Sequence, residues 1–425
     1  MRCPSTSSSK CNRIEIHTLT AEGLKGVADV PLFGRIAAME LFRPAREPRD
    51  LLLVLTTSYK LSILEYGEGG ELLTRGHGET SLCHRCRCAL GPTANLPPPP
   101  LHLSRVDPGD VRDKIGRPAE AGMLAVVDPD CRMIALHLYD GLLKVIPVDG
   151  EGQLLDAFNI RLEELMVKDI KFLYGCARPT FAILYEDARE LRHVKTYEVN
   201  LKEKDLAEGP WQQSNVDMGA NLIIPIPAPL GGAVVVGETI LSYLNTGRNQ
   251  VAIPMPQPTV KRAYGRVDAD GTRHLLSDHL GRLYILGISH DQSGRSVAGL
   301  RVEAIGQCSP AECLAYLDSG VVYIGSSSAD SQLVRIHPEA VGDDPSSFVE
   351  VLETFVHIGP IVDFAIVDLE RQGQGQVVTC SGVHKHGSLR IIRNGIGINE
   401  QASIELEGIK GIWSLRRWAT GCVGS

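Results

Sequence analysis

The sequence predicts an all-β protein, a seven-bladed β-propeller of the WD40-like kind with diverged repeats. Short runs of Val, Ile, Leu and Tyr recur about every 10–15 residues, separated by Gly, Asp, Asn or Pro, which is the pattern of short strands joined by turns. Helical periodicity is almost absent, and the best helical candidate is the short segment 161–166. A repeat of roughly 45 residues that contains several strands is typical of propeller blades.

The predicted strands follow one another along the whole chain, and each is an apolar run bounded by turn residues. The last three form a meander whose joint, 372–375, contains two glycines that adopt positive φ at little cost. The predicted strands are 35–42, 51–56, 61–66, 133–138, 142–148, 181–185, 194–199, 222–227, 233–237, 283–288, 321–325, 361–367, 376–380 and 389–392.

An internal repeat supports the propeller over a pair of β-sandwiches. Residues 127–146 align with residues 267–286 without a gap, and residues 316–336 form a weaker third copy. The offset of 140 residues between the first two copies corresponds to about three blade-sized units. A ring of such units buries the faces that a single blade would expose. Counting four strands per blade gives seven or eight units between Arg13 and Glu407.

One segment, residues 79–109, interrupts this pattern with three cysteines and four consecutive prolines. We interpret it as a disordered insert. Cys83, Cys86 and Cys88 form a C-x-x-C-x-C motif, but a zinc site needs four converging ligands and no second ligand pair follows. Reduced thiols in a flexible loop are therefore the simpler reading. The proline run, 97–100, favours polyproline II and fits either a linker or a docking segment.

Composition argues against several function classes. The net charge is −8 and no run of five basic residues occurs, which disfavours non-specific binding to nucleic acid. No stretch of 18 apolar residues occurs and the polar N-terminus lacks a signal-peptide core, so neither a membrane span nor secretion is predicted. The eleven cysteines are an odd number, and we expect Cys131, Cys176 and Cys380 to be buried free thiols in a reducing compartment.

No catalytic or cofactor motif is present, so we expect a protein that is not an enzyme and holds no cofactor. The nucleophile elbow, the phosphate-binding loops and the zinc-protease motif are all missing. His384 and His386 lie in one loop without a third partner. An enzyme would need clustered titratable groups in the propeller channel, and the sequence does not reveal such a cluster.

Ten segments spread over nearly all of residues 13–413 resemble the first propeller of the DNA damage-binding protein 1 family. That family provides the large adaptor subunits of cullin-RING ubiquitin ligases and is remotely similar to large subunits of RNA 3′-end processing and splicing complexes. The segments are LTAEGL (19–24), MELFRP (39–44), ILEYGEGG (63–70), KIGRPAE (114–120), DPDCRMIALHLYDGLLKVIP (128–147), FNIRLEELMVKDIKFLYGC (158–176), RHVKTYEVNLKEK (192–204), ECLAYLDSGVVYIGS (312–326), DSQLVRI (330–336) and residues 359–398.

The resemblance divides the chain into a first propeller (13–393) with the 79–109 insert inside it, and the start of a second propeller (394–415). Residues 1–12 and 416–425 depart from the family pattern, which suggests a truncated or alternatively spliced form with an incomplete first blade. The family is nuclear, and also cytoplasmic, and acts in nucleotide-excision repair and protein ubiquitination. Its first and third propellers grip a helical segment of substrate receptors, and its second holds the cullin, so we expect cullin binding to be lost here.

The resemblance also implies a receptor-binding surface on this propeller. Damaged DNA would be reached only through a partner subunit, and direct nucleic-acid binding, as in the RNA-processing relatives, is the alternative function. A proline-fixed turn with two β-branched residues would give a rigid apolar rim for a helix, although Ile361 and Val362 open a strand and could instead belong to the core. The family has an aromatic residue in place of His384 and a leucine in place of Ser328, so a weaker grip is expected. The implied residues are Ser328, Pro360, Ile361, Val362, Val383 and His384.

Overall fold

The computed structural model describes residues 5–393, apart from residues 11, 22, 33, 68–71, 78–108, 114–115, 247–249, 293, 343–344, 369–372 and 374. Within these residues all regular structure is β except for one short 3-10 helix, η1 (His384–His386). No helix in this part of the chain is long and apolar enough to cross a membrane. The segment 161–166 is not helical, because Arg161 ends one strand, Met166 begins the next, and Leu162 between them is buried among strands.

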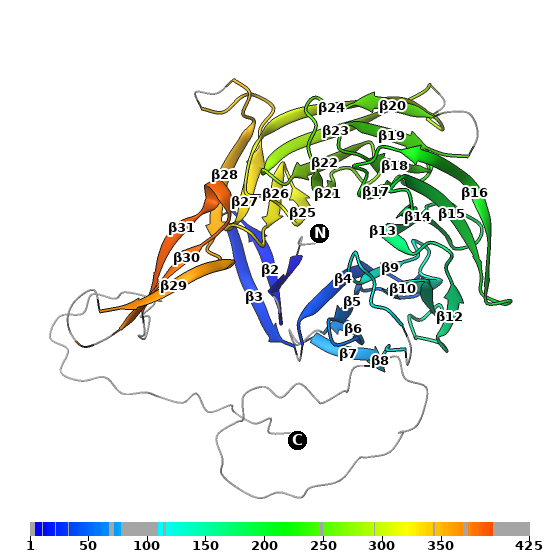
Figure 1. The fold of residues 1–425 in the computed structure, drawn as a ribbon, viewed down its shortest axis with the longest axis horizontal. Coiled ribbons are helices and arrows are strands. Elements are labelled where there is room, and N and C mark those ends of the chain that lie inside the picture. Colours follow the sequence, from blue (N-terminus) through cyan, green and yellow to red (C-terminus); the bar gives the residue numbers. More distant parts are fainter. Residues whose placement is uncertain are drawn as a thin grey trace, which may run out of the picture.

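Seven antiparallel sheets surround a central axis, as predicted, and an eighth lies outside the ring (Figure 1). The ring consists of β1–β3, β4–β8, β9–β12, β13–β16, β17–β20, β21–β24 and β25–β28. The eighth sheet is β29–β31, drawn in orange to red in Figure 1. Its residues were included in the predicted first propeller, 13–393.

The strands of the described residues are short, and most agree with the predicted apolar runs. Their bounds are β1 (Ser5–Lys10), β2 (Arg13–Thr20), β3 (Gly23–Pro31), β4 (Ile36–Phe42), β5 (Leu51–Thr56), β6 (Lys60–Tyr66), β7 (Leu72–His77), β8 (Gly109–Asp110), β9 (Leu124–Val127), β10 (Met133–Tyr139), β11 (Leu142–Pro147), β12 (Phe158–Arg161), β13 (Met166–Phe172), β14 (Thr180–Glu186), β15 (Arg192–Asn200), β16 (Asp205–Val216), β17 (Leu222–Pro225), β18 (Ala233–Val236), β19 (Ile240–Leu244), β20 (Val251–Pro254), β21 (Lys261–Arg266), β22 (Arg273–Asp278), β23 (Arg282–His290), β24 (Val297–Gln307), β25 (Cys313–Asp318), β26 (Val321–Gly325), β27 (Ser331–Ile336), β28 (Val349–Phe355), β29 (Ile361–Val367), β30 (Gln376–Ser381) and β31 (Ser388–Ile392).

The two longest copies of the sequence repeat occupy equivalent places in sheets β9–β12 and β21–β24, which are three sheets apart. A similar ion pair closes the turn between the first and second strands of each sheet, with the arginine one position later in the second copy. The Arg132 guanidinium lies 2.7 Å from the Asp128 carboxylate, and the Arg273 guanidinium lies 2.6 Å from the Asp268 carboxylate. The repeat therefore reflects blade structure, as the sequence predicted.

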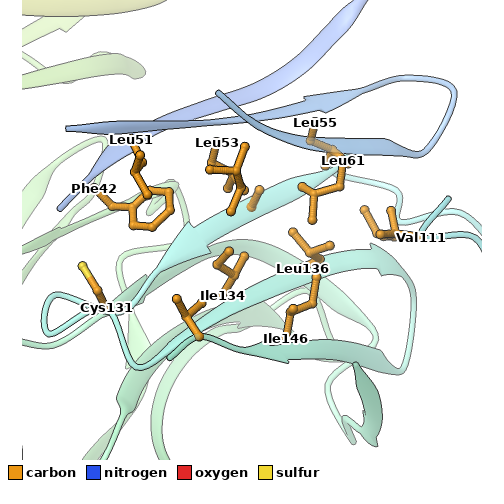
Figure 2. Packing of buried hydrophobic residues seen from close by; sticks show 14 of the residues in the cluster. Phe42, Leu51, Leu53, Leu55, Leu61, Val111, Cys131, Ile134, Leu136 and Ile146 are labelled. Carbon is orange, nitrogen blue, oxygen red and sulfur yellow. The ribbon is translucent and has the colours of Figure 1, made fainter. Parts of the chain in front are cut away.

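The core lies between neighbouring sheets rather than inside any one of them. Between β4–β8 and β9–β12, the side chains of Leu53 and Leu61 face those of Ile134 and Leu136, and all four are fully buried (Figure 2). Five further apolar clusters of the same kind join other neighbouring sheets. Each sheet thus relies on its neighbours to remove its apolar faces from water.

The ring has one junction of a different kind, between β25–β28 and β1–β3. Among the described residues, none of the six apolar clusters includes side chains from both of these sheets. A polar contact is found there instead, in which the Leu24 backbone N–H donates to the Glu353 carboxylate at 3.3 Å. This junction is where the first and last sheets of the ring meet.

The cysteines only partly match expectation. Cys131 is buried, but Cys176 is only half-buried and Cys380 is exposed. Cys380 lies in β30 between Thr379 and Ser381, which are buried. Because side chains alternate across a strand, Cys380 points to the opposite, open face. The predicted insert at 79–109 and the cysteines at positions 83, 86 and 88 fall outside the described residues, apart from Gly109 in β8.

Candidate functional site

The residues implied as a receptor-binding surface lie together at the end of the β29–β31 sheet that meets the ring. We call them the candidate docking surface. Strand β29 begins at Ile361, whose register partner is Ser381 at the end of β30. The Val383 backbone N–H donates to the Ser328 carbonyl at 3.2 Å, which brings the loop after β30 against the β26–β27 loop. The candidate docking surface consists of Ser328, Pro360, Ile361, Val362, Val383 and His384.

Its apolar side chains are exposed, which settles the alternative that they belong to the core. Val362 is 76% exposed and Ile361 is 49% exposed. Pro360 and His384 are also exposed, whereas Ser328 and Val383 are half-buried. A pair of exposed β-branched side chains behind a proline gives a surface that an apolar helix face can cover.

Backbone contacts fix the shape of this surface. Pro360 follows a cis peptide bond, and its carbonyl accepts a hydrogen bond from the Gly382 N–H at 3.0 Å. Gly382 has φ +87°, and a Cβ there would lie 2.2 Å from the His386 carbonyl oxygen. Only glycine therefore fits this turn without displacing the short helix η1. His384 itself adopts φ 51°, which a non-glycine residue rarely does.

An ion pair through a single guanidinium nitrogen, Nη2 of Arg390, links the β29–β31 sheet to the ring. The Arg390 guanidinium in β31 donates to both carboxylate oxygens of Asp330, each at 2.8 Å. Asp330 also accepts from the His357 backbone N–H at 2.8 Å. Burial alone would raise the pKa of the Asp330 carboxyl, but the hydrogen bonds from Arg390 and His357 outweigh burial and hold this pKa below its ordinary value.

The sequence did not reveal this pair as part of the site. Asp330 and Arg390 are separated by 60 positions, and neither belongs to a local motif. Only the topology, which places β31 beside the β26–β27 loop, brings them together. The sequence also assigned no role to the neighbouring His386. Its pKa is lowered, mainly by burial and to a smaller extent by the charge of Lys385.

A second group of titratable side chains, which the sequence did not reveal, lies on the strands nearest the axis. Glu40 in β4, Asp169 and Lys171 in β13 and Tyr264 in β21 come from three different sheets, and these strands face the ring centre (Figure 1). The Lys171 Nζ lies 4.0 Å from the Asp169 carboxylate and 5.8 Å from the Tyr264 ring centroid. These four side chains, which we call the channel cluster, come from strands far apart in the sequence, so no local pattern indicated them.

The members of this channel cluster shift one another's protonation. Asp169 raises the pKa of the Lys171 ammonium above its ordinary value. Burial raises the pKa of Glu40 and of Asp169, and it raises the pKa of Tyr264 to about 12. Asp169 also accepts backbone hydrogen bonds from Ile170 at 2.9 Å and Ile223 at 2.8 Å. The hydrogen bond from Ile223 joins the β13–β16 sheet to its neighbour, β17–β20, which is a structural role.

Two surface hollows among the described residues are lined by none of the residues of either group. The larger, of about 480 Å³, is lined by Lys195, Tyr197 and Trp211 among others, and the smaller, of about 240 Å³, shares Trp211 with it. The Lys195 Nζ is bound to the Glu164 carboxylate at 3.0 Å. This ammonium is therefore already paired within the wall of the larger hollow.

Comparison with known proteins agrees with the seven-sheet ring. The sequence model of the family described as RSE1/DDB1/CPSF1 first beta-propeller matches residues 8–356, a range that ends beside the last strand of the ring, β28. The chain belongs to this family. Its β29–β31 sheet lies beyond the matched range. The resemblance to the DNA damage-binding protein 1 family that the sequence suggested is thereby confirmed.

Plant relatives match nearly the whole chain. It is 54% identical over 409 residues to DNA damage-binding protein 1 of Oryza sativa subsp. japonica and to that of Solanum lycopersicum. It is 53% identical over 411 residues to DNA damage-binding protein 1a of Arabidopsis thaliana. These alignments cover 96% of this chain but 34% of each relative, so the chain spans about a third of the length of the relatives it matches.

Proposed function

We propose that this chain is a non-enzymatic docking domain of a nuclear ubiquitin-ligase adaptor linked to DNA repair. Its candidate docking surface would cover an apolar helix face of a substrate-receptor protein, and no bond would be made or broken. The exposure of Val362, at 76%, is the observation that carries the proposal, because a solvent-facing valine on a backbone fixed by Pro360 and Gly382 costs little entropy when it is covered. The names of the plant relatives support the link to DNA damage.

The surface as it stands predicts weak binding. Two side chains, of Ile361 and Val362, supply most of its exposed apolar area, which is far less than the roughly 800 Å² per partner of a stable interface. We therefore expect a synthetic receptor helix to bind the purified chain with a Kd weaker than about 1 µM, that is, by less than about 8 kcal/mol. Isothermal titration calorimetry measures this directly, and tighter binding would contradict the proposal.

Restoring the residues usual in the family should strengthen the grip. The double substitution Ser328→Leu with His384→Phe adds two apolar anchors, and burying even part of one such side chain contributes about 1.4 kcal/mol, a tenfold gain in affinity. Val362→Asp should abolish binding, whereas Leu165→Asp, at a leucine 59% exposed elsewhere on the ring, should leave it unchanged. Equal losses from both aspartate substitutions would refute the assignment of the surface.

The alternative function, direct nucleic-acid binding, makes a different prediction. Binding would then weaken steeply as salt rises, while Val362→Asp would have little effect on it. The net charge of −8 gives no support to this alternative.

A further inference from the structure

Strand β29 has an open edge with apolar side chains on both faces. Within the described residues it pairs only with β30, so its other edge has no strand partner; the Phe364 N–H donates to the Asp363 carboxylate at 2.8 Å. Phe364 is 62% exposed and Ile366 is 70% exposed. In the third strand of the same sheet, β31, Leu389 and Ile391 are also exposed. Many of the exposed large apolar side chains of the described residues therefore gather on this one sheet.

The outer strands of the ring are protected in a way that β29 is not. Strand β16 carries acidic residues and a proline, and β24 and β28 carry charged residues along their length. Such residues discourage pairing between sheet edges. Strand β29, with the sequence IVDFAIV, has neither proline nor a basic residue, and its one charge is Asp363.

The sequence of β29 is nearly symmetric about its centre. An antiparallel pairing of two β29 strands centred on Phe364 sets Ile361 opposite Val367 and Val362 opposite Ile366, with Phe364 opposite itself. Apolar and aromatic cross-strand pairs of this kind stabilise a sheet. In this register Asp363 lies opposite Ala365, so the two carboxylates do not face each other. The strand therefore fits a second copy of itself.

The area available at the β29 edge suits only a small two-fold interface. Five apolar side chains of β29 are between 40% and 76% exposed, and edge-to-edge pairing covers part of each. This area is less than the roughly 800 Å² that each partner buries in a stable complex. The backbone edge adds hydrogen bonds to this area.

We propose that β29 is the contact strand of a two-fold symmetric dimer of this chain. The two β29 strands pair antiparallel about Phe364 and join the two three-stranded sheets into one. This interface is isologous, so each substitution acts twice across the axis. The paired strands include Ile361 and Val362 of the candidate docking surface, so dimer formation and receptor binding would compete for these side chains.

Multi-angle light scattering on the purified full chain tests the proposal. We expect a mass of twice 46.1 kDa at micromolar protein, and a monomer for Phe364→Lys because two like charges then face each other. Phe364→Glu should also be monomeric, and mixing the two variants should restore the dimer. Leu165→Lys, on the ring, should remain dimeric. A wild-type monomer, large aggregates, or an undisturbed Phe364→Lys dimer would overturn the proposal.

A cross-linking measurement tests the register without relying on charge. In a pair centred on position 364, the two Cα atoms lie about 4.5–5.5 Å apart, which a disulfide can bridge. Phe364→Cys should therefore form a covalent dimer on mild oxidation, above the background of the wild-type cysteines. Ile366→Cys, whose two copies lie about 13 Å apart along the strands, should not. The reverse pattern, or equal yields, would overturn this register.

Discussion

Removing the Arg390 guanidinium should loosen the β29–β31 sheet without unfolding the ring. In Arg390→Met the Asp330 carboxylate loses both of its 2.8 Å side-chain hydrogen bonds and keeps the one from the His357 backbone. Both side chains are 23% exposed, so the stabilising free energy lost with this ion pair lies between the values for a surface pair and for a buried pair. A charge-assisted hydrogen bond contributes about 1.5–3 kcal/mol, and we expect a local loss near 2 kcal/mol.

Hydrogen exchange with mass spectrometry measures this loss region by region. A local destabilisation of about 2 kcal/mol corresponds to roughly 30-fold faster exchange in β30, whose amides are paired on both sides. Exchange in β9–β12 should not change. Arg301→Met removes an arginine that is 80% exposed and should have no effect on either region. Unchanged exchange in β30, or an equal rise throughout the ring, would refute the role of Arg390 in holding the β29–β31 sheet against the ring.

The same tie should depend on pH in a defined direction. The pKa of Asp330 is lowered in the folded protein, so its contribution is present above the ordinary aspartate pKa. It is lost as the pH falls through the lower folded value. Acidification should therefore release β29–β31, and Arg390→Met should be insensitive to it. A release at the same pH in wild type and variant would contradict this mechanism.

Three further outcomes follow from the core and the channel. Leu136→Ala, at a fully buried site, should lower the free energy of unfolding by about 2–5 kcal/mol in chemical denaturation, and a loss below 1 kcal/mol would contradict the inter-sheet core. Burial raises the pKa of Glu40 in the folded protein. The free energy of unfolding should therefore fall as the pH rises from the ordinary glutamate pKa through the raised pKa of Glu40. In thermal scans, Glu40→Gln should make the melting temperature less dependent on pH over this range. Burial raises the pKa of Cys308 to about 12. A thiol reagent at pH 8 should therefore modify the exposed Cys380 long before Cys308. Similar rates of modification at the two cysteines would argue against the burial of Cys308.

The propeller could be predicted because its signals are local. Alternation of apolar runs and turns defines each strand, and the matching turns at Asp128 and Asp268 repeat at a fixed offset. Short stretches of sequence are therefore enough to predict both the strand positions and the blade period. The best helical candidate of the sequence, 161–166, is not helical, because Leu162 is buried between the sheets β9–β12 and β13–β16, where one sheet links to the next.

The site could be predicted only in part because its parts are distant in sequence. Pro360 and Val362 were implied by resemblance, and their exposure depends on where the β29–β31 sheet attaches. The tie between Asp330 and Arg390, and the cluster of Glu40 with Lys171, need contacts across separate sheets. No pattern within one strand encodes such contacts. Cys380 was misassigned because an apolar run does not show which face of a strand meets the ring.

Site-specific photo-crosslinking tests directly whether the candidate docking surface around Val362 binds a helix of a receptor protein, as we propose. A benzophenone amino acid is placed at position 362 and, as a matched control, at position 165. With a purified substrate receptor of a cullin-RING ligase, we expect an adduct at position 362 that maps to a helical segment of the receptor, and none at position 165. Equal adducts at both positions, or none at position 362, would contradict this proposal.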